Sequence, residues 1–405
     1  MLKKYFLNNK KRNFSTASIW IKGGSDMDST GKKGINKILC SLLTRGCEGF
    51  NNFTLSEYIE SYGAELNQEI FEDGISISIK SLNEHFSNLF PLLDLIINKP
   101  ILSETEFKKV KKSSIDHIKK DKENPFNICF EKWRKIVYSN HPYAFNTIGN
   151  ANDVSKITYE DVLLEFKNLK NREKYLISNN PEINGENFGT LEKKILKEKS
   201  DPLNHNLNTR NRFDYINNDS NQTIIMMGDQ TCSRRSSEYF PLKVLESYLS
   251  YGMSAALFKL FREKHGITYD LGVYYPIRSG NAPFLIYLSV SNDQALFAFE
   301  LLSTLWKNLL LNPLTDAEIF LAKEKLKGSF LLGNQSLDEI LQRKIQLVSY
   351  GISPISENDL NSIIEEISSL DILKLTNKYF SKPFLSISGN KNICLEISNR
   401  WKKNF

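Results

Sequence analysis

The sequence has few cysteines, few histidines and no long apolar run. Its five cysteines are scattered and form no Cys-x-x-Cys pair, so it predicts neither a disulfide framework nor a zinc knuckle. This usage favours a reducing compartment. No stretch approaches the roughly 18 apolar residues of a membrane span, and the N-terminus lacks the apolar run of a secretory signal. We expect a soluble, cytoplasmic protein with no membrane partner; a bacterial-type location and an organelle interior both stay open.

Composition excludes further classes of protein. With 40% hydrophobic and 25% charged residues among 405, the chain has the balance of an ordinary globular protein of two or three domains. The net charge of +6 is mild, and the lysines near residues 111–120 fit a solvated helix face. Aromatic and basic residues do not alternate as they do in nucleic-acid binders, so no nucleic-acid partner is predicted.

Internal similarity divides the chain into two halves. A short β-rich run closed by glycine occurs at residues 18–24 (SIWIKGG) and again at 223–228 (TIIMMG). Residues 157–163 (ITYEDVL) and 367–373 (ISSLDIL) match at an offset of 210, and each segment offers a Ser or Thr N-cap with an acid in the first turn. We therefore predict an N-terminal domain over 1–186, a polar linker over 187–222 and a C-terminal domain over 223–405.

Each half mixes strands with amphipathic helices. Helical periodicity marks residues 104–120, 316–332 and 336–350, whereas residues 74–80 alternate with isoleucine on one face, as a half-covered antiparallel strand does. The fold class predicted is α+β, with two duplicated domains that each have a mainly antiparallel sheet flanked by helices.

Residues 34–46 (GINKILCSLLTRG) predict a helix with an apolar stripe and a second, polar face. Lys37, Cys40 and Ser41 lie at i, i+3 and i+4, the spacing with which a helix directs several groups at one point. An ammonium, a thiol and a hydroxyl make no sensible site together. No histidine lies nearby in sequence to activate Cys40 or Ser41 as a nucleophile, so Cys40 is more simply a small core residue.

The chain resembles the insulinase/pitrilysin-type zinc metallopeptidases, most closely the subgroup similar to the mitochondrial processing peptidase. The resemblance in the first half rests on Gly24-Ser25, Gly34, Gly46 and residues 62–67 (YGAELN). In the second half it rests on residues 252–275 (GMSAALFKLFREKHGITYDLGVYY). The resemblance implies that each chain has two domains and forms one half of a clam shell that encloses peptides.

Active members of that family carry an HxxEH zinc motif on the helix that corresponds to residues 34–46. In this chain the motif positions are 37–41 (KILCS), so Lys37 and Ser41 replace the histidines and Cys40 replaces the glutamate base. The region of the third ligand holds Asp116 and His117, and one such group alone does not hold zinc. The resemblance therefore implies no metal and no cofactor in this chain, with zinc in a partner subunit.

The same subgroup carries an Arg and a Tyr, seven residues apart, that reach the active centre, and Arg262 and Tyr269 match this pair. The resemblance implies that both bind substrate, since a guanidinium and a phenol can donate to a peptide carbonyl or oxyanion. Read alone, Arg262 is a surface arginine in a charged run, and Tyr269 is a packing residue of a strand.

Two functions fit these features. The first is a non-catalytic, substrate-binding subunit of a heterodimeric zinc metalloendopeptidase, whose partners are a paralogous HxxEH-bearing subunit and a peptide. The second is an inert scaffold or assembly subunit of the same fold. Retention of Arg262 and Tyr269 favours the first, because a scaffold does not need them.

Overall fold

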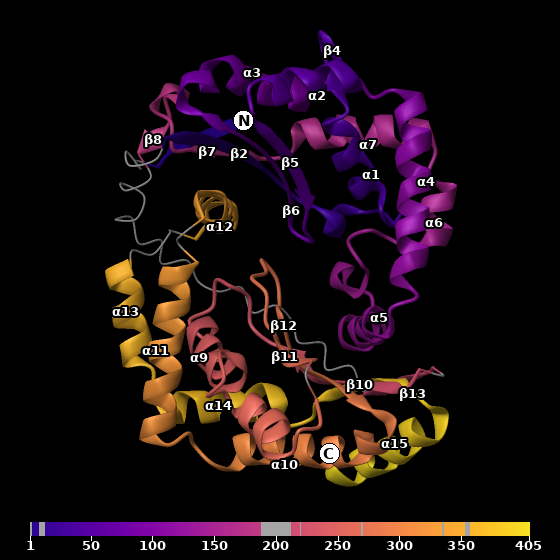
Figure 1. Ribbon diagram of the computed structural model, residues 1–405, viewed down its shortest axis with the longest axis vertical. Helices are drawn as coiled ribbons and strands as arrows, with labels where there is room; N and C mark the ends of the chain where they lie inside the picture. Colours follow the sequence, from indigo (N-terminus) through magenta and orange to yellow (C-terminus); the bar gives the residue numbers. More distant parts are fainter. Residues whose placement is uncertain are drawn as a thin grey trace. The chain divides into compact units, whose positions relative to one another are not determined.

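The computed structural model describes residues 2–7, 13–187, 212–218, 220–268, 270–333, 336–352 and 357–405. The chain divides into two compact units (Figure 1). Unit 1 comprises Met1–Lys120, Phe145–Lys197 and Gly333–Ile355, and unit 2 comprises Asp121–Ala144, Glu198–Leu332 and Ser356–Phe405. None of the described helices combines the length and apolarity needed to span a bilayer.

Unit 1 is built on a six-stranded sheet in the order β5-β6-β2-β7-β1-β8. Its strands are β1 (Leu2–Phe6), β2 (Phe14–Lys22), β5 (Glu65–Ile70), β6 (Gly74–Leu82), β7 (Lys174–Ser178) and β8 (Glu186–Asn187). The pairs β5–β6, β6–β2 and β2–β7 are antiparallel, whereas β1 runs parallel to β7. A separate short hairpin joins β3 (Gly46–Cys47) to β4 (Phe50–Asn51).

Unit 2 has a five-stranded sheet in the order β11-β12-β10-β13-β9. Its strands are β9 (Phe213–Asn217), β10 (Gln222–Gln230), β11 (Asp270–Tyr274), β12 (Pro283–Ser291) and β13 (Phe384–Gly389). The first three neighbouring pairs are antiparallel and β9 runs parallel to β13, so the order and directions repeat those of the first five strands of unit 1. This repetition, with the helices around it, confirms the predicted duplicated α+β fold.

Helices accompany the sheet in each half of the chain. In the first half they are α1 (Ile35–Leu43), α2 (Asn52–Ser61), α3 (Phe86–Asn98), α4 (Glu104–Asp121), α5 (Pro125–Tyr138), α6 (Ala151–Lys156) and α7 (Tyr159–Asn171). In the second half they are α9 (Tyr239–Ser250), α10 (Ala295–Leu311), α11 (Asp316–Leu332), α12 (Leu337–Ser349), α13 (Glu357–Glu366), α14 (Ser369–Phe380) and α15 (Lys391–Asn404).

The two predicted N-caps at offset 210 are both present. Thr158 and Asp161 form a reciprocal capping box at the start of α7, and Ser368 and Asp371 form one at the start of α14. In each box the hydroxyl accepts from the third helical amide while the acid accepts from the cap residue's amide. The sequence pattern therefore marked matching helix starts in both halves.

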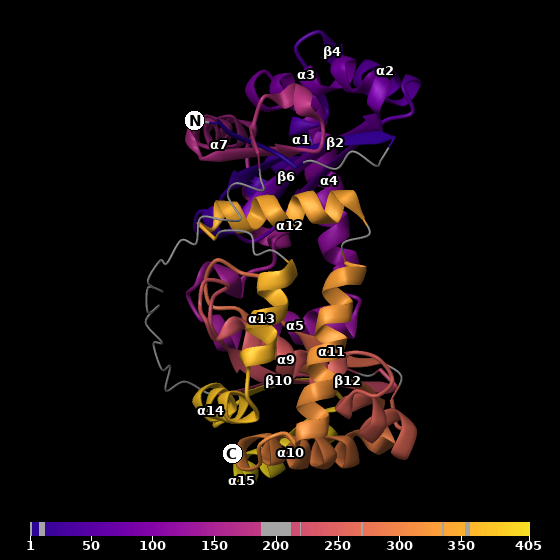
Figure 2. The ribbon, with the colours of Figure 1, turned by 90° about the vertical axis from the view of Figure 1, so that its left-hand side faces the viewer.

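Each sheet receives one helix from the other half of the chain. Helix α12, drawn in orange beside the sheet of the first half, packs on β2 and β7 of unit 1, on the face opposite α1 and α3 (Figures 1 and 2). Helix α5, drawn in purple, packs on β9, β10 and β13 of unit 2, on the face opposite α10 and α15. Helices thereby cover part of both faces of each sheet. Each half of the chain contributes one helix to the sheet of the other half.

Apolar side chains explain both layers of unit 1. The face toward α1 and α3 carries the alternating residues Ile75, Ile77 and Ile79 within the larger core. The opposite face carries Trp20 and Tyr175, and these pack with Leu337, Leu341 and Ile345 of α12. The second core is smaller and depends on a helix that lies more than 150 residues away in sequence.

The compact units differ from the contiguous division predicted from the sequence. Residues 121–144 belong to unit 2 and residues 333–355 to unit 1, because helices α5 and α12 bury their apolar faces on the other half's sheet. The predicted linker at 187–222 contains β9, which pairs with β13. Its residues 188–211 lie outside the part of the chain that the structure describes.

Candidate functional site

Helix α1 presents the apolar stripe that its sequence predicts. Five apolar side chains on this nine-residue helix are at most 3% exposed: Ile35, Ile38, Leu39, Leu42 and Leu43. The helix contacts α7 and the edge strand β5. Burial of this stripe therefore stabilises the position of the helix without any metal ligand on it.

The three motif positions on α1 do not share one environment. Cys40 is completely buried, whereas Lys37 and Ser41 are partly exposed. Burial raises the pKa of the Cys40 thiol to about 12; the nearby Lys37 lowers it and Glu69 of β5 raises it further, both by less than burial does. A neutral, buried thiol is neither a metal ligand nor a nucleophile at physiological pH. This environment agrees with the prediction that Cys40 is a core residue.

The start of α1 is held by a carboxylate that lies well before it in sequence. Asp28 accepts from the backbone amides of Gly34 at 2.7 Å and Asn36 at 3.1 Å, so it satisfies two of the orphan donors at the helix start. It also accepts from the Asn36 side chain at 2.8 Å. Burial raises the pKa of Asp28, although these hydrogen bonds oppose the shift.

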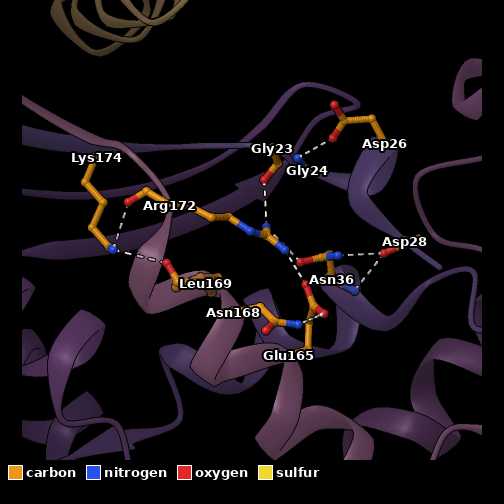
Figure 3. Close-up of polar contacts among 10 residues, drawn as sticks. All are labelled: Gly23, Gly24, Asp26, Asp28, Asn36, Glu165, Asn168, Leu169, Arg172 and Lys174. Atoms are coloured by element: carbon orange, nitrogen blue, oxygen red, sulfur yellow. Dashed lines mark hydrogen bonds and ion pairs between the residues drawn. The ribbon is translucent and has the colours of Figure 1, made fainter. Parts of the chain in front are cut away.

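Arg172 continues this network from α1 toward α7 (Figure 3). Its guanidinium donates to the carbonyl oxygen of Gly23 at 2.9 Å and to Asn36 Oδ1 at 3.0 Å, and it forms a partly buried ion pair with Glu165 of α7. Asn36 is fully buried and bridges Asp28 to Arg172. Chain segments that are far apart in sequence are thereby joined around the helix that would carry the zinc motif.

A second acid lies beside this network at the end of strand β2. Asp26 accepts from the amide of Gly24 at 2.8 Å (Figure 3). Burial is the main cause that raises the pKa of Asp26 to about 6, and Asp73 adds to it. A Cβ on Gly24 would lie 1.9 Å from the carbonyl oxygen of Phe71, so only glycine allows this approach to the turn between β5 and β6.

The residues expected at the third-ligand region are exposed. Asp116 and His117 both lie on the solvent side of α4. Across the described parts of the chain, no group of three or more His, Cys, Asp or Glu side chains is arranged to hold a metal ion. These side chains therefore offer no metal-binding geometry on which a catalytic step could be built.

The structure places only one member of the predicted substrate-binding pair. Arg262 is exposed on a π-helix, η5 (Phe258–Lys264), with its guanidinium carbon 4.9 Å from the centre of the Phe258 ring. Phe261 of the same helix is fully buried. Gly266 follows at φ +62°, a conformation suited to glycine, and β11 begins at Asp270. Tyr269 lies outside the described residues.

Sequence reasoning missed the residues that position α1. The contact that joins Arg172 to Asn36 and Asp28 spans more than 130 residues of chain, and no local sequence pattern predicts a contact of that kind. A capping acid usually precedes its helix directly, whereas Asp28 lies six residues before Gly34. The run of glycines and acids at 23–28 was the available signal, because backbone that approaches closely needs glycine.

Comparison with known families covers most of the chain. Residues 5–151 match the family described as insulinase (peptidase family M16), and residues 182–326 match the family described as the peptidase M16 inactive domain. Proteins named as uncharacterized zinc proteases are similar over nearly the full length. The protein from Rickettsia felis is 23% identical over 370 residues (89% of this chain and 88% of that protein). The protein YmxG from Bacillus subtilis is 22% identical over 398 residues (95% of both).

Solved structures share the fold. A peptidase M16 inactive domain from Pseudomonas fluorescens has a TM-score of 0.79 at 19% identity, covering 96% of this chain and 95% of its own. A protease from Helicobacter pylori has a TM-score of 0.81 at 17% identity, covering 95% of this chain and 96% of its own. The resemblance seen in the glycines and in residues 252–275 thus extends over both halves.

Proposed function

Because the chain belongs to the insulinase family of peptidases (peptidase family M16), we propose that it is the non-catalytic, substrate-binding subunit of a heterodimeric zinc metalloendopeptidase. Its partner would be a paralogous chain with an intact HxxEH motif, and that partner would hold the zinc ion. The substrate would be a peptide for processing or degradation. Relatives named zinc proteases over nearly the same length support a role in proteolysis.

One observation carries this proposal: helix α1 is kept in place while its chemistry is absent. The helix retains its buried stripe and its anchors at Asp28 and Asn36. The motif positions on it hold Lys37, Cys40 and Ser41 instead of two histidines and a glutamate. An ammonium in place of a ligand also repels a divalent cation. A subunit that forms one half of a chamber needs the helix for its shape but not its ligands.

In the complex, zinc in the partner would activate a water molecule for hydrolysis. The contribution of this chain would come from Arg262 and Tyr269. The exposed guanidinium of Arg262 can donate a charge-assisted hydrogen bond to a peptide carbonyl or carboxylate. The Tyr269 hydroxyl can donate to the oxyanion that forms in the transition state.

The test is co-purification of the native protein, followed by mass spectrometry and zinc analysis. We expect a second chain of the same family with HxxEH, about one zinc per heterodimer, and no stoichiometric zinc on this chain alone. An interface between obligate partners should bury more than about 2,000 Å². Recovery of this chain as a monomer, or with one zinc per chain lost on chelation together with peptidase activity, would overturn the proposal. A stable heterodimer that cleaves no peptide would favour the scaffold alternative.

A further inference from the structure

Unit 2 contains a pocket of about 380 Å³ between the start of α5 and the edge of the sheet. All of its lining residues belong to unit 2. They come from the N-terminal turn of α5 and from strands β10, β11 and β12: Asn124, Pro125, Phe126, Gln222, Ile224, Asp270, Tyr287 and Ser289. The volume is in the range of small-molecule sites, and it is large enough for one long side chain.

Aromatic rings form the apolar wall of this pocket. The rings of Phe126 and Tyr287 pack at 5.1 Å between centres, with planes at 88°. The Tyr287 ring lies over Gly272 of the neighbouring strand, where a Cβ would come within 2.7 Å of its hydroxyl oxygen. Glycine at that position therefore lets the ring lie flat against the strand. Contacts with Phe126 and with the strand at Gly272 therefore fix the position of the Tyr287 ring.

Asp270 provides the only formal charge among the lining residues. Within the described part of the chain, its carboxylate has no hydrogen bond and no ion pair, while its backbone carbonyl accepts from Thr268 at 3.1 Å. The carboxylate influences Tyr287: burial first, and Asp270 second, raise the pKa of that tyrosine. The pocket thus combines an exposed negative charge with an aromatic wall.

Two backbone positions in the first turn of α5 offer no amide hydrogen to a ligand. Pro125 has no amide hydrogen, and the amide of Phe126 already donates to Asn124 Oδ1 at 2.9 Å. Ser289 likewise donates to Gln222 Oε1 at 3.2 Å. An anion entering the pocket would meet the exposed carboxylate of Asp270, whereas a cation would meet its opposite charge, so the pocket favours a cation.

We propose that this pocket binds the basic side chain, arginine or lysine, of the peptide that the protein holds. The ion would pair with Asp270 while its aliphatic stem and charged head lie against the rings of Tyr287 and Phe126, as cations do on aromatic faces. This inference rests on the proposed peptide-binding function and adds a preference for basic peptides. The site lies entirely in this chain, so the full-length chain alone suffices to test it.

The experiment compares two short blocked peptides that differ at one position, arginine in one and citrulline in the other. Citrulline keeps the size and most donors of arginine but carries no charge. The full-length protein should bind the arginine peptide about three- to tenfold more tightly, the range expected for one partly exposed ion pair with a cation–π contact. This preference should shrink as salt rises from about 50 to 500 mM.

Matched variants locate the effect. Asp270→Asn should bind both peptides with equal affinity, near that of the citrulline peptide. Tyr287→Leu should reduce the preference, and Tyr287→Phe should retain it because the ring remains. Asp316→Asn removes the same charge from an exposed position at the start of α11 and should leave the preference unchanged.

The outcomes separate this inference from the proposed function. Equal, measurable affinity for both peptides would overturn the basic-side-chain site and leave peptide binding standing. Tighter binding of a glutamate-containing peptide would also overturn it. If the full-length chain binds none of the peptides, both the site and the substrate-binding role proposed for this subunit fail.

Discussion

Asp28 accepts two hydrogen bonds from Asn36, one from its backbone amide at 3.1 Å and one from its side-chain amide at 2.8 Å. The same asparagine accepts from Arg172 at 3.0 Å through its side-chain oxygen. A fully buried amide thus connects a carboxylate to a guanidinium and holds the start of α1. The helix that lacks the zinc motif is therefore fixed by polar contacts as well as by its apolar stripe.

We expect Asn36→Ala to lower the free energy of unfolding by about 2–4 kcal/mol, because one buried and one partly buried hydrogen bond to charged groups are lost. Equilibrium urea unfolding at pH 7 measures this change. Asn98→Ala is the matched control: it removes an exposed bond to Asp94 at 2.7 Å and should cost less than about 0.5 kcal/mol. Equal losses in the two variants would show that the bridge does not stabilise α1.

The pH dependence of stability should change when Asp26 is replaced. The native state keeps the Asp26 proton up to about pH 6, whereas the unfolded chain releases it near its ordinary pKa of 3.8. The native state therefore binds more protons between these values, and the contribution of Asp26 is full below the unfolded pKa and is lost as pH rises through 6. Asp26→Asn keeps an acceptor for Gly24, so it should be more stable than wild type at pH 7 by about 1–2 kcal/mol and no more stable at pH 3.5.

An acid with the opposite shift provides the control for Asp26. Hydrogen bonds from Ser368 hold the pKa of Asp371 below its usual range. Its contribution is present above the unfolded pKa and is lost as pH falls through the folded pKa, so Asp371→Asn should be less stable than wild type at pH 7. If both variants shift stability in the same direction at pH 7, the assignment for Asp26 is wrong.

The cysteines should be unreactive in the folded protein. All five are buried, and burial raises the pKa of Cys40 and of Cys129 to about 12. A thiol reagent at pH 8 should label none of them in the native chain and all five after denaturation. Rapid labelling of Cys40 in native protein, identified by peptide mass spectrometry, would reopen the hypothesis of a cysteine nucleophile.

The exchanged helix should be needed for unit 1 to fold. A fragment of residues 1–186 lacks α12, so Trp20 and Tyr175 lose their cover of Leu337, Leu341 and Ile345. We expect this fragment to bind a hydrophobic dye, and a peptide of residues 333–355 to reverse that binding. In the full chain, Leu341→Ala should cost about 2–5 kcal/mol and the exposed Leu370→Ala much less. A fragment that folds without the peptide would contradict this dependence.

Periodicity predicted much of the fold. The helix predicted over 316–332 agrees with α11 to the residue, and the strand predicted over 74–80 lies within β6, because both patterns are local in sequence. The exchange of α5 and α12 could not be predicted in this way. Both helices have an ordinary apolar face, and nothing in a helix sequence states which sheet that face will cover.

The sequence likewise predicted one part of the candidate site and missed another. Family resemblance located α1 and the altered motif on it, and the structure shows that Cys40 is a core residue. The pocket beside Asp270 escaped sequence analysis, since its walls come from four elements separated by up to 165 residues. The sequence does not distinguish Tyr287 from the other aromatic residues, and only the pairing with Gly272 shows that its ring lies across the neighbouring strand.

The last prediction concerns Arg262 and Tyr269 in the assembled heterodimer. Arg262→Ala should lower kcat/KM for peptide cleavage by about 2–4 kcal/mol of transition-state free energy if the guanidinium donates to developing charge. Tyr269→Phe removes one hydroxyl and should lower kcat more than it raises KM, because its hydrogen bond would form in the transition state. Arg262 is exposed, so its replacement should leave folding and dimer formation unchanged.

Lys264→Ala removes another exposed cation from the same helix; it is the control and should cleave at the wild-type rate. Each variant is reconstituted with the wild-type zinc subunit and assayed for peptide cleavage. If Arg262→Ala and Tyr269→Phe also cleave at the wild-type rate, the pair has no part in catalysis and the scaffold function gains support.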